Sequence, residues 1–376
     1  MNIDIIRIFA FVFIVMLHTL NRQYGLTVWM SGYAVISTGV NLFIMISGYL
    51  LLDKKETVKD FFKKRFFSIL PLFVVFNIVY IYFYNHSFIA IKKISAPHFW
   101  YIYMILGLYL LTPWLRKVLQ YAEKETFYVV ILWFLCNVLN PYIQFFRLPK
   151  IPFSHFPITG FIGYYILGYY FKKYRHKLEK IPFMYIIAVY LAGFFISVLS
   201  TKYVLVTTGN RISDFFDKNS LGTFFMSISF FAFWIKFNFK SRNRIIRVIS
   251  DSTYFAYLIH IIVLHHAIEI KDEMIFKSVV TIIESIIMGV LYNYVKRIFD
   301  EFCKKTGYEK ALPVIDEWLE NNNPNTRRAV TEGLRIWTSR PYFKENPNEA
   351  IERIANLKED GSEYVRKSVG NALRDI

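Results

Sequence analysis

The chain has 376 residues with a formal net charge of +17, and 55% of them are hydrophobic. Charged residues make up 19%, compared with about 25% in an average soluble domain, and the mean hydropathy is +0.33. This composition excludes an ordinary soluble protein and predicts an all-α, polytopic membrane protein. The two cysteines, Cys136 and Cys303, argue against a disulfide scaffold.

The first expected helix, residues 4–20, carries two ionisable side chains inside an apolar run, Arg7 and His18. They are eleven positions apart, so they lie about 16 Å apart along the axis and within roughly 20° of one face. One interpretation is an interface anchor at Arg7 and a hydrated histidine at His18. The other is a functional pair, because ionisable groups inside membrane spans are costly.

We expect ten membrane spans. They are residues 4–20, 33–52, 66–85, 98–115, 126–146, 157–171, 182–201, 221–236, 253–269 and 275–295. Several are shorter than the about 20 residues of a full span, which a bundle tolerates when protein buries the freed backbone groups. No small-residue cleavage site follows the first span, so we interpret it as retained rather than as a signal peptide.

Lys and Arg are about twice as frequent in the loops on the side of the N-terminus as in the opposite loops. The positive-inside rule therefore predicts cytoplasmic N- and C-termini in a plasma membrane. The loop 53–65 is the densest basic stretch of the membrane part. It is interpreted either as a product of this rule and of attraction to anionic lipid, or as a phosphate-binding mouth.

Other polar residues near the membrane allow more than one interpretation. His260, with Tyr254 and Tyr257, either lines a substrate site or forms an internal network. The outer-loop histidines are predicted to be solvated, and they show no metal-ligand spacing. They are His86, His98 and His155. The sequence shows no nucleophile elbow and no glycine-rich phosphate loop, and we expect no metal.

The character of the chain changes near residue 303, so we divide it into a transmembrane domain, 1–303, and a soluble helical domain, 304–376. The second part has 13 basic and 12 acidic residues. Amphipathic helices are expected at about 308–321, 325–338, 347–358 and 362–375. Paired helices of this length indicate two HEAT-like repeats.

Residues 1–297 resemble the acyltransferase-3 family of integral membrane O-acyltransferases. The resemblance begins with the spacing of Arg7 and His18. It continues in five further phrases: 41–50 (NLFIMISGYL), 61–71 (FFKKRFFSILP), Trp100 with 108–113 (LYLLTP), 164–170 (YYILGYY) and 251–260 (DSTYFAYLIH). Each phrase is weak alone, and their common order makes the resemblance strong. It implies an enzyme that moves acyl groups from acyl-CoA to extracytoplasmic acceptors.

The resemblance also implies roles for individual residues. His18 would be the general base or a transient acyl carrier, and Arg7 would hold the donor or the developing negative charge. Arg65, Lys64 and Lys63 would bind the phosphates of CoA. The family usually has a second arginine three residues after the first in this basic stretch, and here that place holds Ser68. Lys64 would replace this arginine as a point charge, without the paired hydrogen bonds that a guanidinium forms.

The implied acceptor-binding residues lie outside the first helix. They are Tyr254, His260 and Trp100. Acyl-CoA, with acetyl-CoA as the default, would be a donor substrate rather than a tightly bound cofactor. The partners would be membrane lipid, the donor and a hydroxyl acceptor such as a cell-surface glycan. The acceptor, the acyl chain, the choice between an acyl-enzyme and direct transfer, and the oligomeric state stay open.

The segment 308–376 resembles HEAT-like DNA alkylation-repair glycosylases through 325–335 (NTRRAVTEGLR) and 360–376 (DGSEYVRKSVGNALRDI). Only about 70 residues of such an enzyme are present, and their charge is almost balanced, so we predict no nucleic-acid partner. No flexible linker precedes the segment. We therefore interpret it as a rigid appendage, either an engineered fusion or, alternatively, a natural docking module.

Two functions of different classes are considered for the membrane part. The first is O-acyl transfer from cytoplasmic acyl-CoA to an outer acceptor. The alternative is export or flipping of a cell-surface polysaccharide or lipid-linked intermediate. The pair Arg7 and His18, together with the basic stretch 63–65, favours the enzyme, since export does not require them. A bias toward Ile, Phe, Lys, Tyr and Asn indicates a bacterial source.

Overall fold

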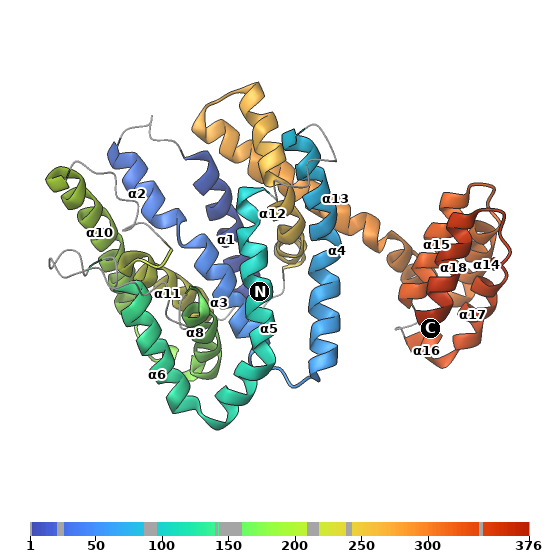
Figure 1. Cartoon of the computed structure of the whole chain (residues 1–376), viewed down its shortest axis with the longest axis horizontal. Helices are drawn as coiled ribbons and strands as arrows, with labels where there is room; N and C mark the ends of the chain where they lie inside the picture. The colour runs from blue at the N-terminus through green and yellow to red at the C-terminus, as the bar shows by residue number, and fades with distance from the viewer. Residues whose placement is uncertain are drawn as a thin grey trace. The chain divides into compact units, whose positions relative to one another are not determined.

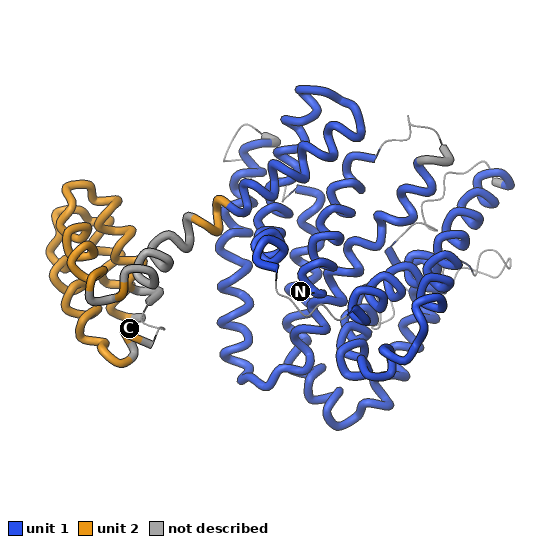
Figure 2. Tube along the Cα trace, turned by 180° about the vertical axis from the view of Figure 1, so that it is seen from behind, with its two compact units in different colours: residues 1–290 blue, residues 291–376 orange. Residues whose placement is uncertain are grey.

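The computed structural model describes residues 2–20, 26–85, 96–139, 142, 160–208, 218–237, 243–337 and 341–375. In these ranges every regular element is a helix, which confirms the all-α prediction. The chain forms two compact units, residues 1–290 and 291–376 (Figure 2).

The first unit is a bundle of helices of unequal length (Figure 1). Its first elements are α1 (Asn2–Thr19), α2 (Leu26–Ile36), α3 (Gly39–Leu51), α4 (Val58–Asn85), η2 (Pro97–Phe99) and α5 (Trp100–Tyr121). It continues with α6 (Glu123–Trp133), η3 (Phe134–Val138), α8 (Ile162–Lys173), α9 (Arg175–Leu178), α10 (Phe183–Thr208), α11 (Leu221–Lys236) and α12 (Arg244–Ile270). The last helix, α13 (Met274–Thr306), extends past residue 290.

Seven helical segments in the described residues are long and apolar enough to cross a membrane. They are Asn2–Thr19, Trp29–Leu51, Val58–Phe83, Pro97–Tyr121, Phe183–Thr207, Arg244–Ile270 and Met274–Tyr294. The chain therefore has the helices of a multi-pass membrane protein. The prediction of ten full spans is not confirmed in number.

Three of the ten predicted spans do not reach membrane length in the described residues. Residues 221–236 form the apolar but 16-residue α11, and 157–171 overlaps the 12-residue α8. The stretch 126–146 falls on α6 and η3 and then passes outside the described residues. Apolar composition predicted these helices correctly, but a full span needs about 20 residues. Much of α8 and α11 is buried against neighbouring helices instead.

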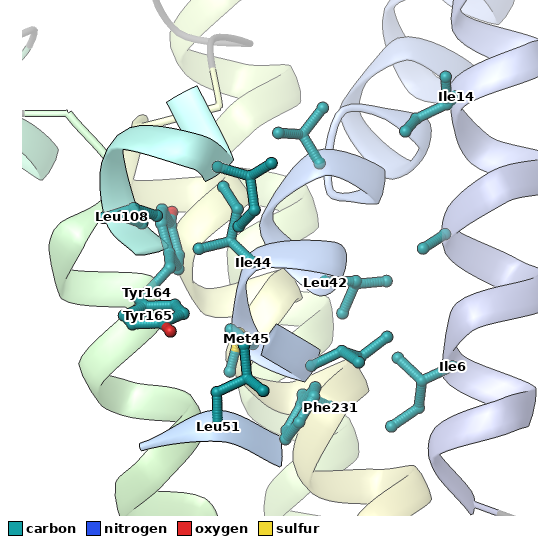
Figure 3. Packing of buried hydrophobic residues seen from close by; sticks show 14 of the residues in the cluster. Ile6, Ile14, Leu42, Ile44, Met45, Leu51, Leu108, Tyr164, Tyr165 and Phe231 are labelled. Carbon is teal, nitrogen blue, oxygen red and sulfur yellow. The ribbon is translucent and has the colours of Figure 1, made fainter. Parts of the chain in front are cut away.

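Two of the sequence phrases noted above form one tight helix crossing. A Cβ added to Gly48 of α3 would lie 1.8 Å from the carbonyl oxygen of Tyr165 of α8. A Cβ on Gly168 would lie 2.1 Å from the carbonyl oxygen of Met45. Figure 3 shows Tyr164 and Tyr165 against the helix that carries Ile44 and Met45. Only glycine lets the two backbones approach this closely. The crossing forms one wall of the bundle, and α1 packs on α3 and α12.

The second unit is a small helical domain with its own core. Its helices are α14 (Tyr308–Leu319), α15 (Pro324–Trp337), α16 (Pro341–Glu345), α17 (Pro347–Ala355) and α18 (Glu363–Asp375). Its apolar cluster includes Ile315, Leu334, Ile354 and Val365, all with exposed fractions of 0%. The four expected amphipathic helices correspond to α14, α15, α17 and α18, and the short α16 was not expected.

Candidate functional site

A cavity of about 420 Å³ lies in the first unit, between α1, α3, α4, α5 and α12. Three cations line it: Arg7 of α1, Lys54 of the loop after α3, and Arg65 of α4. No Asp or Glu is among the residues that line it. Four tyrosines complete much of the wall: Tyr101, Tyr109, Tyr254 and Tyr257. A cavity of this size and charge suits a small ligand that carries several negative charges.

Arg7 is held at this cavity by a short relay of hydrogen bonds. Its Nη1 donates to the Ser250 hydroxyl of α12 at 3.1 Å. That hydroxyl donates to Asp4 Oδ1 at 3.0 Å. Asp4 stands three residues before Arg7, on the same face of α1. The relay orients the guanidinium while leaving other N–H donors for a ligand in the cavity.

The loop between α3 and α4 is fixed by Arg116 of α5. Arg116 donates from Nε and Nη2 to the Leu51 carbonyl at 2.9 and 2.7 Å, and from Nη2 to Glu56 Oε1 at 2.9 Å. Its guanidinium also stacks 4.7 Å from the centroid of the Phe61 ring. Burial opposes ionisation of Glu56, but hydrogen bonding to Arg116 and its charge outweigh this, so the pKa of Glu56 is lowered. These contacts keep Lys54, in the same loop, at the cavity.

The predicted phosphate-binding residues are separated by the structure. Arg65 lines the cavity, and its Nε is buried without a hydrogen-bond partner in the described part of the chain. Lys63 and Lys64 are exposed and are not among the lining residues. Lys64 approaches Glu56 at 3.7 Å instead. Ser68, at the place of the expected second arginine, does line the cavity.

His18 belongs to a cluster of three imidazoles. Its ring centroid lies 5.3 Å from that of His260 and 6.4 Å from that of His98, and the last two are 4.9 Å apart. His98 and His260 are buried, whereas His18 is exposed at one side although protein atoms surround it. His18 is therefore the imidazole of the three that a substrate can reach. No group of three metal-ligating side chains occurs in the described residues, so the cluster is not arranged as a metal site.

The prediction that His98 is solvated is wrong, because only 4% of it is exposed. Pro97 starts the short helix η2, which turns His98 toward the bundle and against Tyr80, at 5.1 Å between ring centroids. A histidine beside the phrase that begins at Trp100 was the one signal in the sequence that pointed to this. His86 and His155 lie outside the described residues.

Tyr257 connects the cavity to the histidine cluster. It lines the cavity, its hydroxyl donates to the carbonyl oxygen of His98, and its own carbonyl lies 2.6 Å from His260 Nδ1. With Nδ1–H as the donor, Nε2 of His260 becomes an acceptor, and it is buried without a partner among the described residues. Tyr257 thus contacts both the cationic cavity and the histidine cluster, although none of the three histidines is among the described residues that line the cavity.

The remaining predicted acceptor residues lie at opposite ends of this site. Tyr254 lines the cationic cavity, and its hydroxyl donates to the Ile69 carbonyl at 2.8 Å. Trp100 follows directly after η2, stacks on Phe161 and contacts the ammonium of Lys218. Lys54, His98, Arg116 and Lys218 were not predicted from the sequence. Lys54 and Lys218 lie between helices and His98 lies in the short η2, where the apolar pattern does not indicate the course of the chain, and the role of Arg116 on α5 depends on its contact with the loop after α3.

Comparisons with known proteins address each end of the chain. The family described as an acyltransferase domain matches residues 2–291, and the family described as a DNA alkylation repair enzyme matches residues 263–376. A Bacillus subtilis (strain 168) protein named "Uncharacterized protein YhaZ" is 39% identical over 72 residues, which are 18% of this chain and 20% of that protein.

Two crystal structures from Streptococcus mutans also match. One is of AlkD2, 51% identical, covering 36% of this chain and 60% of that one. The other is of smu.31 from strain UA159, 50% identical, covering 36% and 62%. Both have a TM-score of 0.20. The chain thus spans about three fifths of these proteins and a fifth of the Bacillus relative. Its C-terminal region is related to DNA alkylation repair proteins, and the chain as a whole, through the match over residues 2–291, belongs to the acyltransferase-3 family.

Proposed function

We propose that the membrane unit transfers an acyl group, by default acetyl, from cytoplasmic acyl-CoA to a hydroxyl of an extracytoplasmic glycan or other cell-surface acceptor. The observation that carries this proposal is the cavity lined by Arg7, Lys54 and Arg65, which adjoins the histidine cluster. CoA carries several phosphate charges, and guanidinium groups bind phosphate through paired, charge-assisted hydrogen bonds.

The donor is held by the cations at one end of the site. Arg65 and Lys54 bind the phosphates, and Nε of Arg65, which has no hydrogen-bond partner among the described residues, donates one of the bonds. Arg7 lies deeper on α1 and is oriented by Ser250. It therefore holds the donor at this end of the site, with the acyl group extending from there toward His18. Lys63 and Lys64 contribute only to the positive field near the entrance.

His18 then acts as the base at the other end. It takes the proton of the acceptor hydroxyl as the oxygen forms a bond to the acyl carbon. The carbon–sulfur bond breaks, and the leaving thiolate receives the proton from His18, so the products are an ester and free CoA. Transfer through an acyl-His18 intermediate keeps the same balance of atoms. Trp100 and His260 hold the acceptor beside His18, and Nε2 of His260 has no hydrogen-bond partner among the described residues.

This reaction requires access from both sides of the membrane. The proposed orientation puts the N-terminus and, after two crossings, the loop with Lys54 in the cytoplasm, where acyl-CoA is found. Arg7 and His18 are eleven residues apart on α1, about 16 Å along the helix axis. Helix α1 thus carries Arg7, which contacts the donor, toward the inner surface and His18, the base, toward the outer surface.

The experiment that tests this function uses the purified full chain and labelled acetyl-CoA, with and without acceptor. The wild type is expected to release CoA, and His18→Ala to lower the rate at least about 100-fold while donor binding persists. His176→Ala, at an exposed histidine of α9, is the matched control and should behave as the wild type. Donor binding without any CoA release in the wild type, or full activity of His18→Ala, would contradict the proposal. Failure to bind the donor at all would favour the export alternative.

For the second unit we propose that it has no nucleic-acid partner. Two of its arginines are engaged inside the unit: Arg327 pairs with Asp360 at 2.7 Å, and Arg353 with Asp316 at 2.7 Å. Nucleic-acid binding depends on cations that are available to phosphates. The full chain is therefore expected to show no binding to a labelled 20-base-pair duplex at micromolar concentration and low salt. A dissociation constant in the nanomolar range would contradict this.

A further inference from the structure

Lys218 is fixed in place by two buried side chains from distant parts of the sequence. Its carbonyl oxygen accepts hydrogen bonds from Asn41 Nδ2 at 2.7 Å and from the Tyr164 hydroxyl at 2.9 Å. Both donor residues have exposed fractions of 0% and belong to α3 and α8, the helices of the tight glycine crossing. Lys218 therefore has a defined backbone position just before α11, unlike a lysine in a long surface loop.

Its side chain extends to Trp100, which lies two residues after His98 in the sequence. The ammonium lies 4.3 Å from the centroid of the Trp100 ring, and that ring stacks on Phe161 at 5.6 Å with an angle of 30°. A cation–π contact attracts the ammonium but leaves its positive charge in place. Trp100 follows the short helix that carries His98, and the charge of Lys218 interacts with His18. Lys218 does not line the donor cavity, so it is a separate positive charge at the acceptor end.

We propose that Lys218 selects an anionic acceptor: a saccharide that carries a carboxylate or phosphate in addition to the hydroxyl that receives the acyl group. The anionic group would pair with the Lys218 ammonium while the hydroxyl reaches His18. The neighbouring residue fits such a ligand, since Oδ1 of Asn219 is buried without a hydrogen-bond partner in the described residues and accepts a sugar hydroxyl. This inference rests on the proposed acyl transfer and adds the charge of its acceptor.

A phospholipid headgroup offers the same negative charge as an acidic sugar. The position of Lys218 favours the saccharide, because its half-buried side chain contacts Trp100 and acts on His18 inside the bundle. A lysine that serves lipid extends to the membrane surface instead.

The test compares acceptors with the full chain in lipid-free detergent and saturating acetyl-CoA. The acceptors are a galacturonate oligomer, a galactose oligomer of equal length and galactose 6-phosphate. The wild type is expected to use an anionic acceptor with at least about tenfold higher kcat/KM than the neutral one. Lys218→Gln should remove about tenfold of this preference through KM, and Lys218→Arg should retain most of it. Lys202→Gln, at an exposed lysine of α10, is the matched control.

The following outcomes would overturn the inference or the proposed function. Equal loss on charged and neutral acceptors, or no loss with Lys218→Gln, overturns the inference. If no saccharide is acylated, calorimetric titration measures the binding of the galacturonate oligomer to the wild type and to Lys218→Gln. Binding that does not depend on Lys218 overturns the inference. Lys218-dependent binding of phosphatidylglycerol vesicles without saccharide binding assigns the charge to lipid and also overturns it. CoA release without acceptor, measured in the same samples, reports the donor reaction separately, so its absence contradicts the proposed function rather than the acceptor class alone.

Discussion

The two units of this protein place their cations in opposite settings. In the membrane unit, Arg7, Lys54 and Arg65 line a cavity, and the described residues of its wall include no carboxylate. In the C-terminal unit, Arg327 forms a bidentate pair with Asp360, at 2.7 and 2.8 Å, within the domain itself. A cation paired inside a domain mainly stabilises that domain. Cations that face a cavity without such partners are placed for an anionic ligand.

Arg116 shows that the membrane unit also uses a paired arginine where a loop must be held. Only 12% of its side chain and 10% of that of Glu56 are exposed. The pair does not line the cavity, but it fixes the loop that brings Lys54 there. Whether a cation is paired with a carboxylate therefore depends on its role and not on the unit in which it lies.

The largest effect is expected from Arg65→Ala, which removes a cation of the cavity. Loss of charged hydrogen bonds worth about 1.5–3 kcal/mol should raise KM for acetyl-CoA roughly 10- to 100-fold. The free energy of unfolding should stay within about 0.5 kcal/mol of the wild type, because no carboxylate of the cavity wall loses a partner. Steady-state kinetics at varied donor and fixed acceptor concentrations measure the first quantity, and chemical denaturation of the full chain measures the second.

Lys63→Ala is the matched control for this variant, since Lys63 lies two residues away but is exposed and does not line the cavity. It should change KM for the donor less than about twofold. An equal increase in KM for both variants would indicate a general electrostatic effect and would contradict a specific phosphate contact at Arg65.

A smaller effect is expected from Asp360→Asn, on the stability of the second unit rather than on donor binding. The variant should lower the stability of the second unit by roughly 1–3 kcal/mol, because it removes a charged pair from a side chain of which only 5% is exposed. KM for the donor should not change. Hydrogen exchange of α15 and α18 in the full chain measures the stability. Glu363→Gln, in the exposed pair with Lys367, should cost at most about 0.5 kcal/mol.

The pair of Arg327 and Asp360 also predicts that the stability of the second unit depends on pH. Hydrogen bonding to Arg327 lowers the pKa of Asp360 below its usual value of 3.8, so the carboxylate binds fewer protons in the folded state than in the unfolded state. The pair therefore stabilises the unit fully above the unfolded pKa, and this stability is lost as the pH falls below about 4 toward the lowered pKa. Asp360→Asn should remove this part of the dependence. An unchanged acid profile in the variant would contradict the assignment.

Helical periodicity predicted the part of the site that lies on regular helices. Arg7 and His18 share one face of α1 because eleven residues make about three turns. His260 on α12 was predicted either to line a substrate site or to form an internal network, and the structure places its ring 5.3 Å from that of His18. In each case one long apolar helix sets the direction of the side chain, so spacing along the sequence is enough to relate the residues.

The parts that depend on loops and on helix length could not be predicted in this way. Lys54 rather than Lys63 or Lys64 reaches the cavity because Arg116 holds the loop from another helix. His98 is buried because a short helix turns it inward. The apolar run 157–171 suggested a span, but its helix has 12 residues and is buried through close glycine contacts with α3. These outcomes depend on contacts between distant residues, which periodicity does not show.

The most direct test of this account is a cryo-electron microscopy structure of the full chain with acetyl-CoA bound. We expect donor density in the cavity, with phosphates within hydrogen-bond distance of Arg65 and the thioester directed past Arg7 toward His18. Donor density outside the cavity, with its phosphates on Lys63 and Lys64 and no contact to Arg65, would contradict it.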